Sequence, residues 1–179
     1  MSARIKAVIA VLLVALAFVC GPALSKTPDG WEFVEFNQAV AIAQRSGKPL
    51  FVYFGFETCP YCEYANKHAF SSQELHKRYA AHYVLAYFDV RGAAGDMITL
   101  PGGEKLTRAQ AIKHFRASPV PAWMFVTADG REVLMRRGSR TPLDSFMKFD
   151  DYVAGGAYKT EKSFGDYLAK RGLREEIPE

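Results

Sequence analysis

Apolar residues form two nearly continuous runs, at residues 50–56 and 82–89, and a third run at residues 123–127. Short apolar runs bounded by Gly, Pro and Asp are typical of strands that are covered on both faces of a sheet. The third run is followed by the turn sequence Asp129-Gly130 and by an apolar segment at residues 132–137. This arrangement predicts an antiparallel hairpin in a sheet whose central strands are buried.

The segments between these runs carry the start and stop signals of helices. Asn37 is a residue type that favours a helix N-cap, and Gly47 is a type that ends helices. The sequence Ser71-Ser72-Gln73-Glu74 matches a capping box. The predicted helices have these approximate bounds: residues 38–46 after Asn37, 59–69, 71–81 opening at the capping box, 107–116 with Thr107 as cap, 141–153 opening at Thr141-Pro142, and 160–171 with Thr160 as cap.

Residues 91–106 form an insert between the second apolar run and the next predicted helix. Its sequence Pro101-Gly102-Gly103 lies between two short segments that favour strands, so we expect a small hairpin. Gly-rich loops also bind phosphate groups, but no Lys-Ser/Thr pair follows this one, and it matches no nucleotide fingerprint. A plain turn is the interpretation that the residues favour.

The tetrad Cys59-Pro60-Tyr61-Cys62 stands between a predicted strand and a predicted helix, which is the position of a thiol–disulfide redox site. At a helix N-terminus, the unpaired N–H groups and the helix dipole favour the thiolate of Cys59, the attacking nucleophile. Pro60 suits the first helical position, because it has no N–H group and its φ is fixed. Cys62 follows about one turn later, where it can attack a mixed disulfide and release the substrate.

Two other interpretations of the cysteine pair stay open at this point. A Cys-x-x-Cys pair can be half of a zinc site, but the sequence has no second such pair and only 4 histidines to complete it. The nearest, His68, falls on the same predicted helix as Cys62. A purely structural disulfide would close a loop too small to stabilise a chain of this size appreciably. The redox interpretation is preferred, and no metal is expected.

The composition is that of one globular domain, with 49% hydrophobic and 23% charged residues in a chain of 179. The net charge of +4 includes Arg4 and Lys6, which lie in a segment that we expect to be removed; without these two positive charges it is +2. The other basic residues are scattered rather than gathered on one stripe. Nucleic-acid binding is therefore not expected.

Residues 1–25 have the pattern of a secretory signal peptide. Two positive residues precede an apolar stretch at residues 7–19, which is too short to span a bilayer comfortably. The small residues of Ala23-Leu24-Ser25 favour cleavage before Lys26. Lipidation of Cys20 is one alternative, although the residue before Cys20 matches a lipidation signal poorly. A second alternative is that the segment is not cleaved and anchors the protein in the membrane.

Export would place the mature chain in an oxidising compartment, the periplasm, where disulfides persist. Cleavage before Lys26 removes Cys20, so that Cys59 and Cys62 are the cysteines that remain. A reductant that works in such a compartment needs electrons from elsewhere.

The predicted order of elements resembles that of the thioredoxin superfamily over nearly all of the mature chain. The order is strand, CxxC helix, strand, helix, X-Pro, strand, Asp-Gly turn, strand and helix. The resemblance implies a thioredoxin fold of the α/β class, with a central mixed β-sheet flanked by helices, as one domain over residues 26–179. The insert would add a small hairpin to this fold.

The same resemblance implies a substrate site. Val120-Pro121 would be the cis-proline pair beside the reactive cysteine, with the Val120 backbone hydrogen-bonded to a substrate peptide. An ordinary loop proline is the alternative for Pro121. Pro60 and Tyr61 would complete the site, with the Tyr61 ring on an exposed apolar docking surface.

Within the superfamily, the chain is most similar to exported thioredoxin-like proteins of the SoxW type. The points of likeness are the insert and the C-terminal segments at residues 152–158 and 163–168. This resemblance implies a periplasmic reductant that takes electrons from a membrane thiol donor of the DsbD or CcdA type and passes them to disulfides of exported proteins. No cofactor besides the redox-active Cys59–Cys62 pair is expected, and a monomer is favoured.

Two features depart from the thioredoxin pattern. Thioredoxins keep a buried acid six residues before the first cysteine, where this chain has Tyr53, which titrates too high to move a proton at neutral pH. Glu57 is the nearest alternative carboxylate for proton transfer, with a simply solvated side chain as the other interpretation. The dipeptide Pro60-Tyr61 is found in glutaredoxins, which implies a reduction potential on the order of −200 mV.

The residues leave the direction of electron flow open. One alternative is a disulfide oxidase or isomerase, and a glutathione-linked activity is suggested by Pro60-Tyr61. A third is a redox-inactive binding protein that uses the thioredoxin scaffold. Replacement of Cys59 by Ser separates this last alternative from the others, because a pure binding protein would keep its activity.

Overall fold

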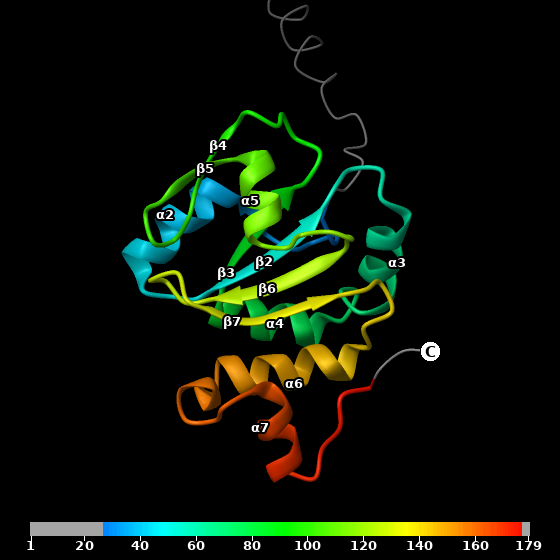
Figure 1. Ribbon diagram of the computed structural model, residues 1–179. Coiled ribbons are helices and arrows are strands. Elements are labelled where there is room, and N and C mark those ends of the chain that lie inside the picture. The colour runs from blue at the N-terminus through cyan, green and yellow to red at the C-terminus, as the bar shows by residue number, and fades with distance from the viewer. Residues whose placement is uncertain (1–26, 177–179) are drawn as a thin grey trace, which may run out of the picture.

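The computed structural model describes residues 27–176, which form a mixed five-stranded sheet with helices on both faces (Figure 1). The strand order is β1-β3-β2-β6-β7. The central strand β2 pairs in parallel with β3 and in antiparallel orientation with β6. The strands of this sheet are β1 Val34–Glu35, β2 Leu50–Gly55, β3 Val84–Asp89, β6 Ala122–Val126 and β7 Glu132–Arg137.

The helices lie on the two faces of this sheet, as Figure 1 shows. One face carries α2 Phe36–Ser46 and α5 Arg108–His114, together with the predicted hairpin, β4 Met97–Thr99 and β5 Lys105–Thr107. The other face carries α3 Pro60–His68, α4 Gln73–His82 and α6 Leu143–Val153. The chain ends with the short 3-10 helix η1 Ala157–Lys159 and with α7 Phe164–Lys170, which packs against α6.

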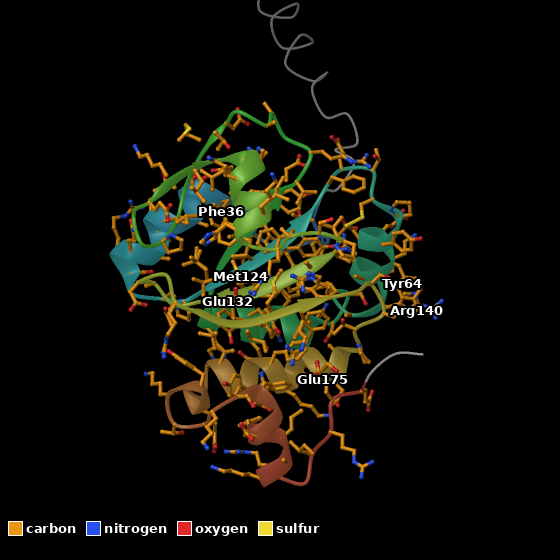
Figure 2. All side chains as sticks on the ribbon, in the orientation of Figure 1. Phe36, Tyr64, Met124, Glu132, Arg140 and Glu175 are labelled. Carbon is orange, nitrogen blue, oxygen red and sulfur yellow. A yellow bond between two sulfur atoms is a disulfide. The ribbon has the colours of Figure 1, made fainter. Side chains whose placement is uncertain are left out.

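The core consists of two apolar clusters, one on each face of the sheet. All residues of β2 are buried, and successive side chains of this strand alternate between the clusters. Tyr53 belongs to the cluster under α3, α4 and α6, whereas Phe54 belongs to the cluster under α2 and α5. Figure 2 labels Phe36 and Met124, which lie in this second cluster. The prediction that the central strands are covered on both faces is confirmed.

The structure corrects the cap predicted for α2. Glu35 caps the helix in place of Asn37, because its carboxylate accepts hydrogen bonds from the backbone amides of Asn37 and Gln38. The Asn37 side chain instead binds the hairpin: it donates to the Met97 carbonyl (3.0 Å) and accepts from the Thr99 amide (2.8 Å). Contacts with residues distant in the sequence thus override the local preference of Asn37 for the N-cap.

Two further caps differ from the prediction by one and three positions. The first helical turn of α4 is capped by Ser72 rather than by Ser71, and that of α7 by Ser163 rather than by Thr160. In both helices the serine hydroxyl accepts a hydrogen bond from the backbone amide three residues later. Where several Ser and Thr residues are close together, the motif alone does not fix the cap. Thr107 caps α5 as predicted.

Within residues 27–176, no helix combines the length and the apolar character that a membrane span needs. The signal peptide expected at residues 1–25, and Cys20 with it, lie outside the described residues. Their interpretation therefore stays a prediction from the sequence.

Candidate active site

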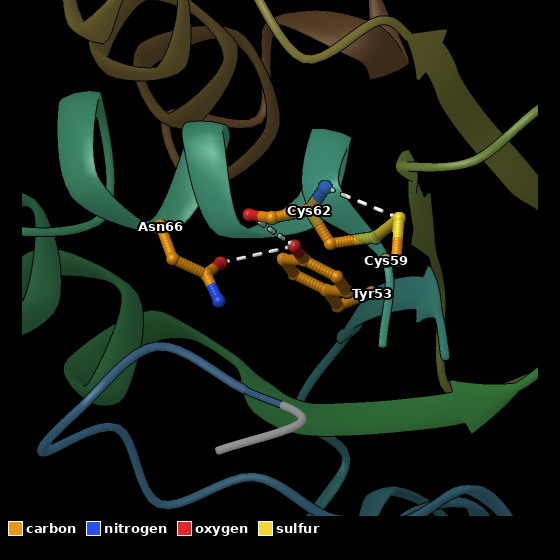
Figure 3. Close-up of a disulfide and its surroundings, with 4 residues drawn as sticks. All are labelled: Tyr53, Cys59, Cys62 and Asn66. Carbon is orange, nitrogen blue, oxygen red and sulfur yellow. Dashed lines mark hydrogen bonds between the residues drawn. A yellow bond between two sulfur atoms is a disulfide. The ribbon is translucent and has the colours of Figure 1, made fainter. Parts of the chain in front are cut away.

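Cys59 and Cys62 form a disulfide at the N-terminus of α3, with their Cα atoms 5.2 Å apart (Figure 3). Cys59 is the N-cap residue, and Pro60 is the first residue of the helix, as the sequence predicts. The backbone amide of Cys62 donates a hydrogen bond to Sγ of Cys59 (3.2 Å). In the reduced protein, this amide and the helix dipole would favour the thiolate of Cys59.

An open groove of about 660 Å³ connects the disulfide with solvent. Both cysteines line this groove, although only 5% of Cys59 and 3% of Cys62 is exposed. Pro60 and Glu57 line it as well. Tyr61 projects into solvent, with 67% of its surface exposed. The disulfide is thus shielded from bulk solvent, open on one side and flanked by an exposed aromatic ring.

Tyr53 extends from β2 to the first turns of α3, behind Cys62 (Figure 3). Its hydroxyl lies within hydrogen-bonding distance of Oδ1 of Asn66 (2.9 Å) and of the Cys62 carbonyl oxygen (3.3 Å). Burial raises the pKa of Tyr53 far above its ordinary value, and the neighbouring Tyr87 adds to this effect. The phenol therefore stays protonated, and it acts as a hydrogen-bond donor rather than as a base.

The sequence analysis missed Asn66 as a residue of this site. Asn66 follows Cys62 by four positions, about one turn along α3, and it lines the same groove as the cysteines. A polar residue four positions after the second cysteine is the signal that would have identified it.

Gly55, the last residue of β2, leaves room for the second cysteine. A Cβ atom at this position would lie 3.0 Å from Cε1 of Tyr53 and 3.2 Å from Sγ of Cys62. Both distances are shorter than ordinary van der Waals contacts. The close approach of strand and helix therefore depends on the missing side chain.

The loop that precedes β6 holds the expected cis-proline pair. The Val120–Pro121 peptide bond is cis, as the resemblance to thioredoxins implies. The Ser118–Pro119 bond, which the sequence analysis did not single out, is cis as well.

This loop lies opposite the end of β2 that approaches Cys62. Phe54 of β2 pairs with Ala122 of β6, and the same register continued by one residue places Pro121 opposite Gly55. Val120 is partly buried and packs against the apolar cluster that contains both cysteines. Val120 packs against the other apolar cluster as well. The register thus places Pro121 opposite Gly55, the residue that leaves room for Sγ of Cys62, and the role of Val120 and Pro121 in substrate binding stays a prediction.

Glu57 is exposed at the groove, two residues before Cys59. Burial is the main cause of a raised pKa of Tyr87, and the negative charges of Asp89 and Glu57 add to it. The hydroxyl of Tyr87 is buried and has no hydrogen-bond partner among residues 27–176. The charge of Glu57 therefore acts on Tyr87 near the groove. The role of Glu57 in proton transfer stays a prediction from the sequence.

Among the described residues, no group of three or more His, Cys, Asp or Glu side chains is arranged to hold a metal ion. The ring of His68, the histidine nearest to the cysteines in the sequence, lies against the Tyr64 ring in a tilted arrangement, with 4.1 Å between ring centroids. Nδ1 of His82 lies 2.8 Å from Oδ1 of Asp150. These two histidines have partners other than the cysteines.

A family model described as a thioredoxin-like domain matches residues 36–154 of the chain. The match extends from α2 to α6, and so includes the cysteine pair and the loop before β6. No curated protein matches the chain.

Many solved structures are similar to the chain, among them the following three. A thioredoxin from Thermus thermophilus is 28% identical, with a TM-score of 0.56, and the alignment covers 71% of this chain and 91% of that one. A thioredoxin-fold protein from Helicobacter pylori is 16% identical, with a TM-score of 0.59 and coverage of 83% and 89%. A DsbH oxidoreductase is 11% identical, with a TM-score of 0.53 and coverage of 79% and 92%. The expected fold, a central mixed sheet flanked by helices, is thus confirmed.

Proposed function

The chain belongs to the thioredoxin-like family, and on that premise we propose that it is an exported thiol–disulfide oxidoreductase that reduces disulfides of periplasmic proteins. The observation that carries the proposal is the Cys59–Cys62 disulfide at the N-terminus of α3, with a backbone amide directed at Sγ of Cys59. The likeness to a thioredoxin from Thermus thermophilus supports the same chemistry. The two cysteines alternate between dithiol and disulfide, and oxidation of the dithiol supplies the electrons that reduce the substrate.

In the reduced protein, the thiolate of Cys59 attacks one sulfur of a substrate disulfide. A bond forms between Cys59 and that sulfur, the substrate's sulfur–sulfur bond breaks, and the other substrate sulfur leaves as a thiolate that takes up a proton. Cys62 then loses its proton and attacks Sγ of Cys59, which closes the Cys59–Cys62 disulfide and releases the second substrate thiol. Two electrons and two protons pass from the protein to the substrate.

We assign substrate binding to the loop before β6 and to the first turn of α3. Val120 lies just outside the β6 ladder, which begins at Ala122, so that an extended substrate segment can continue the pairing beside the disulfide. Pro60 and Pro121 fix φ on the two sides of this site. The exposed ring of Tyr61 offers the substrate an apolar contact.

The proton of Cys62 needs an acceptor when this residue attacks the mixed disulfide. Tyr53 does not accept it, because its buried phenol is already protonated. Glu57 is a carboxylate on the groove that leads to both cysteines. We therefore assign proton transfer to Glu57, through the solvent of the groove.

The proposed direction of electron flow and the compartment rest on the sequence. The signal pattern at residues 1–25 supports export to the periplasm, and the SoxW-type features support a reductant. A membrane thiol donor of the DsbD or CcdA type would return Cys59 and Cys62 to the dithiol form. The proposed working unit is a monomer.

Reduction of insulin by dithiothreitol tests the proposed activity, because reduced insulin chains precipitate and the turbidity can be followed. Catalytic amounts of the mature chain should accelerate precipitation, and the Cys59→Ser variant should not. A wild-type protein no faster than dithiothreitol alone would contradict the proposal. So would a Cys59→Ser variant as active as the wild type.

A further inference from the structure

The loop between α5 and β6 begins with an unusual backbone conformation. Arg116 has a φ of 54°, and among residues 27–176 it is the one residue other than glycine with a positive φ. Residues with a Cβ atom seldom adopt this left-handed region, so the surrounding contacts have to hold it. Four residues later the same loop reaches Val120, which we assigned to substrate binding.

Arg137, the last residue of β7, holds the start of this loop. Its Nε and Nη2 atoms both donate to the carbonyl oxygen of Arg116, at 3.0 and 2.6 Å. The guanidinium of Arg116 donates from Nη2 to both carboxylate oxygens of Glu132, the first residue of β7, at 2.7 and 2.8 Å. Figure 2 labels Glu132 on this strand. Arg116 is therefore hydrogen-bonded to residues at both ends of β7.

The other end of the loop is tied to the same strand. The backbone amide of Gly138, directly after Arg137, donates to the carbonyl of Pro121 at 3.1 Å. The segment from Arg116 to Pro121 is thus fixed at its two ends by neighbouring residues at the end of β7. Between these two ties lies Val120, packed against the cluster that contains the cysteines.

A fixed loop is important for the reaction when the substrate disulfide is part of a polypeptide. Strand-like pairing with Val120 places the substrate sulfur correctly only if the distance between the Val120 backbone and Cys59 stays constant. Small displacements of a bound substrate reduce reactivity strongly, since attack requires the reacting atoms to be near contact and aligned. A small disulfide without a polypeptide backbone has no such requirement for Val120.

We propose that Arg137 is a positioning residue for protein substrates, which acts by holding the Arg116 carbonyl and, through the loop, the backbone of Val120. The inference rests on the proposed function. Arg137 is exposed, and the carbonyl that it binds can be hydrated when the guanidinium is removed. The substitution Arg137→Met should therefore loosen the loop without unfolding the protein.

The test compares two substrates and three variants. Arg137→Met removes both donors, Arg137→Lys keeps the charge and one donor, and Arg45→Met is the matched control at an exposed position near the end of α2. For insulin, kcat/KM of Arg137→Met should fall about tenfold, and Arg137→Lys should lie between it and the wild type. For the small disulfide dithiobis(nitrobenzoate), and for the reduction potential, all variants should equal the wild type.

Amide hydrogen exchange provides a readout that does not depend on activity. The amides of Ala117 and Gly138, which donate to the carbonyls of Ile112 and Pro121, should exchange faster in Arg137→Met than in the wild type or in Arg45→Met. Unchanged exchange in Arg137→Met, or an equal loss of rate on insulin and on the small disulfide, would overturn the positioning role. If wild-type protein reduces neither disulfide, the proposed function fails, and the exchange data still decide whether Arg137 holds the loop.

Discussion

The hydroxyl of Tyr53 lies 2.9 Å from Oδ1 of Asn66, and this neutral pair stands directly behind Cys62. The resemblance to thioredoxins leads one to expect a buried acid at the position of Tyr53. The phenol and the amide instead form a hydrogen bond that also supports the carbonyl of Cys62. The Tyr53–Asn66 pair therefore carries no negative charge, and the groove on the side of Glu57 is the route that we propose for the proton of Cys62.

Tyr53→Phe should destabilise the fold while it keeps the packing of the ring. The substitution leaves Oδ1 of Asn66 and the Cys62 carbonyl without their buried donor, so the free energy of unfolding should fall by about 1–3 kcal/mol in urea titrations. Tyr61→Phe is the matched control, because the Tyr61 side chain is exposed. Equal stabilities of the two variants would show that the Tyr53 hydroxyl has no structural role.

The two cysteines should behave differently when each is replaced by serine. Cys62→Ser retains the nucleophile but cannot resolve the mixed disulfide, so a covalent complex between Cys59 and a substrate protein should accumulate and be visible on non-reducing gels. Cys59→Ser should form no such complex. Complexes of similar yield with both variants would contradict the assignment of Cys59 as the attacking residue.

Gly55→Ala should disturb the contact between β2 and the disulfide. The added Cβ atom would lie too close to the Tyr53 ring and to Sγ of Cys62, which we expect to cost about 1–3 kcal/mol of unfolding free energy. Gly95→Ala is the control, because a Cβ atom there meets nothing within 4 Å. A neutral effect of Gly55→Ala would mean that the helix and strand can separate at no cost.

Asp150 joins α4 to α6 through a buried carboxylate. Its side chain is fully buried and lies 2.7 Å from Nε of Arg78, 2.8 Å from Nδ1 of His82 and 2.9 Å from the Tyr83 hydroxyl. Asp150→Ala leaves all three without this partner and should lower the free energy of unfolding by about 3–5 kcal/mol in urea titrations. Asp151→Ala, which removes a half-exposed partner of Arg78, should cost less than about 1 kcal/mol. Similar losses in the two variants would refute the role of the buried carboxylate.

Alkaline pH should destabilise the protein through its buried tyrosines. Burial raises the pKa of Tyr53, Tyr79 and Tyr83 above the ordinary value of 10.0. Above pH 10.0 the unfolded chain therefore loses these protons while the folded chain keeps them. The free energy of unfolding should then fall with rising pH, by about 1.4 kcal/mol per pH unit for each phenol, and these groups should have no effect below that range. Tyrosinate absorbance from the three phenols should appear together with unfolding; ionisation of them in the folded protein would contradict their burial.

Features that depend on neighbouring residues were predictable from the sequence. The position of Cys59 and Pro60 at the start of α3 follows from local helix chemistry, and the bounds of β7 follow from the Asp129-Gly130 turn that precedes it. The resemblance to thioredoxins added the loop at Val120, which no local signal identifies as a substrate site.

Features that depend on tertiary contacts were not predictable in this way. Asn37 has the side chain of a helix cap, but the hairpin at Met97 binds it, across 60 residues. The contact of Asn66 with Tyr53 joins two different elements, and so does that of Arg137 with Arg116. Such pairs are set by the packing of the fold, and single-residue preferences carry no record of them.

The reduction potential of the Cys59–Cys62 pair tests the central claim most directly. The mature chain, from Lys26 onward, would be equilibrated with defined mixtures of reduced and oxidised glutathione, and the fraction of dithiol would be read from the mass of alkylated protein. A potential near or below about −220 mV is the result expected of a reductant, since glutaredoxins and thioredoxin have such values. A potential above about −150 mV would contradict the proposed direction of electron flow and indicate an oxidase.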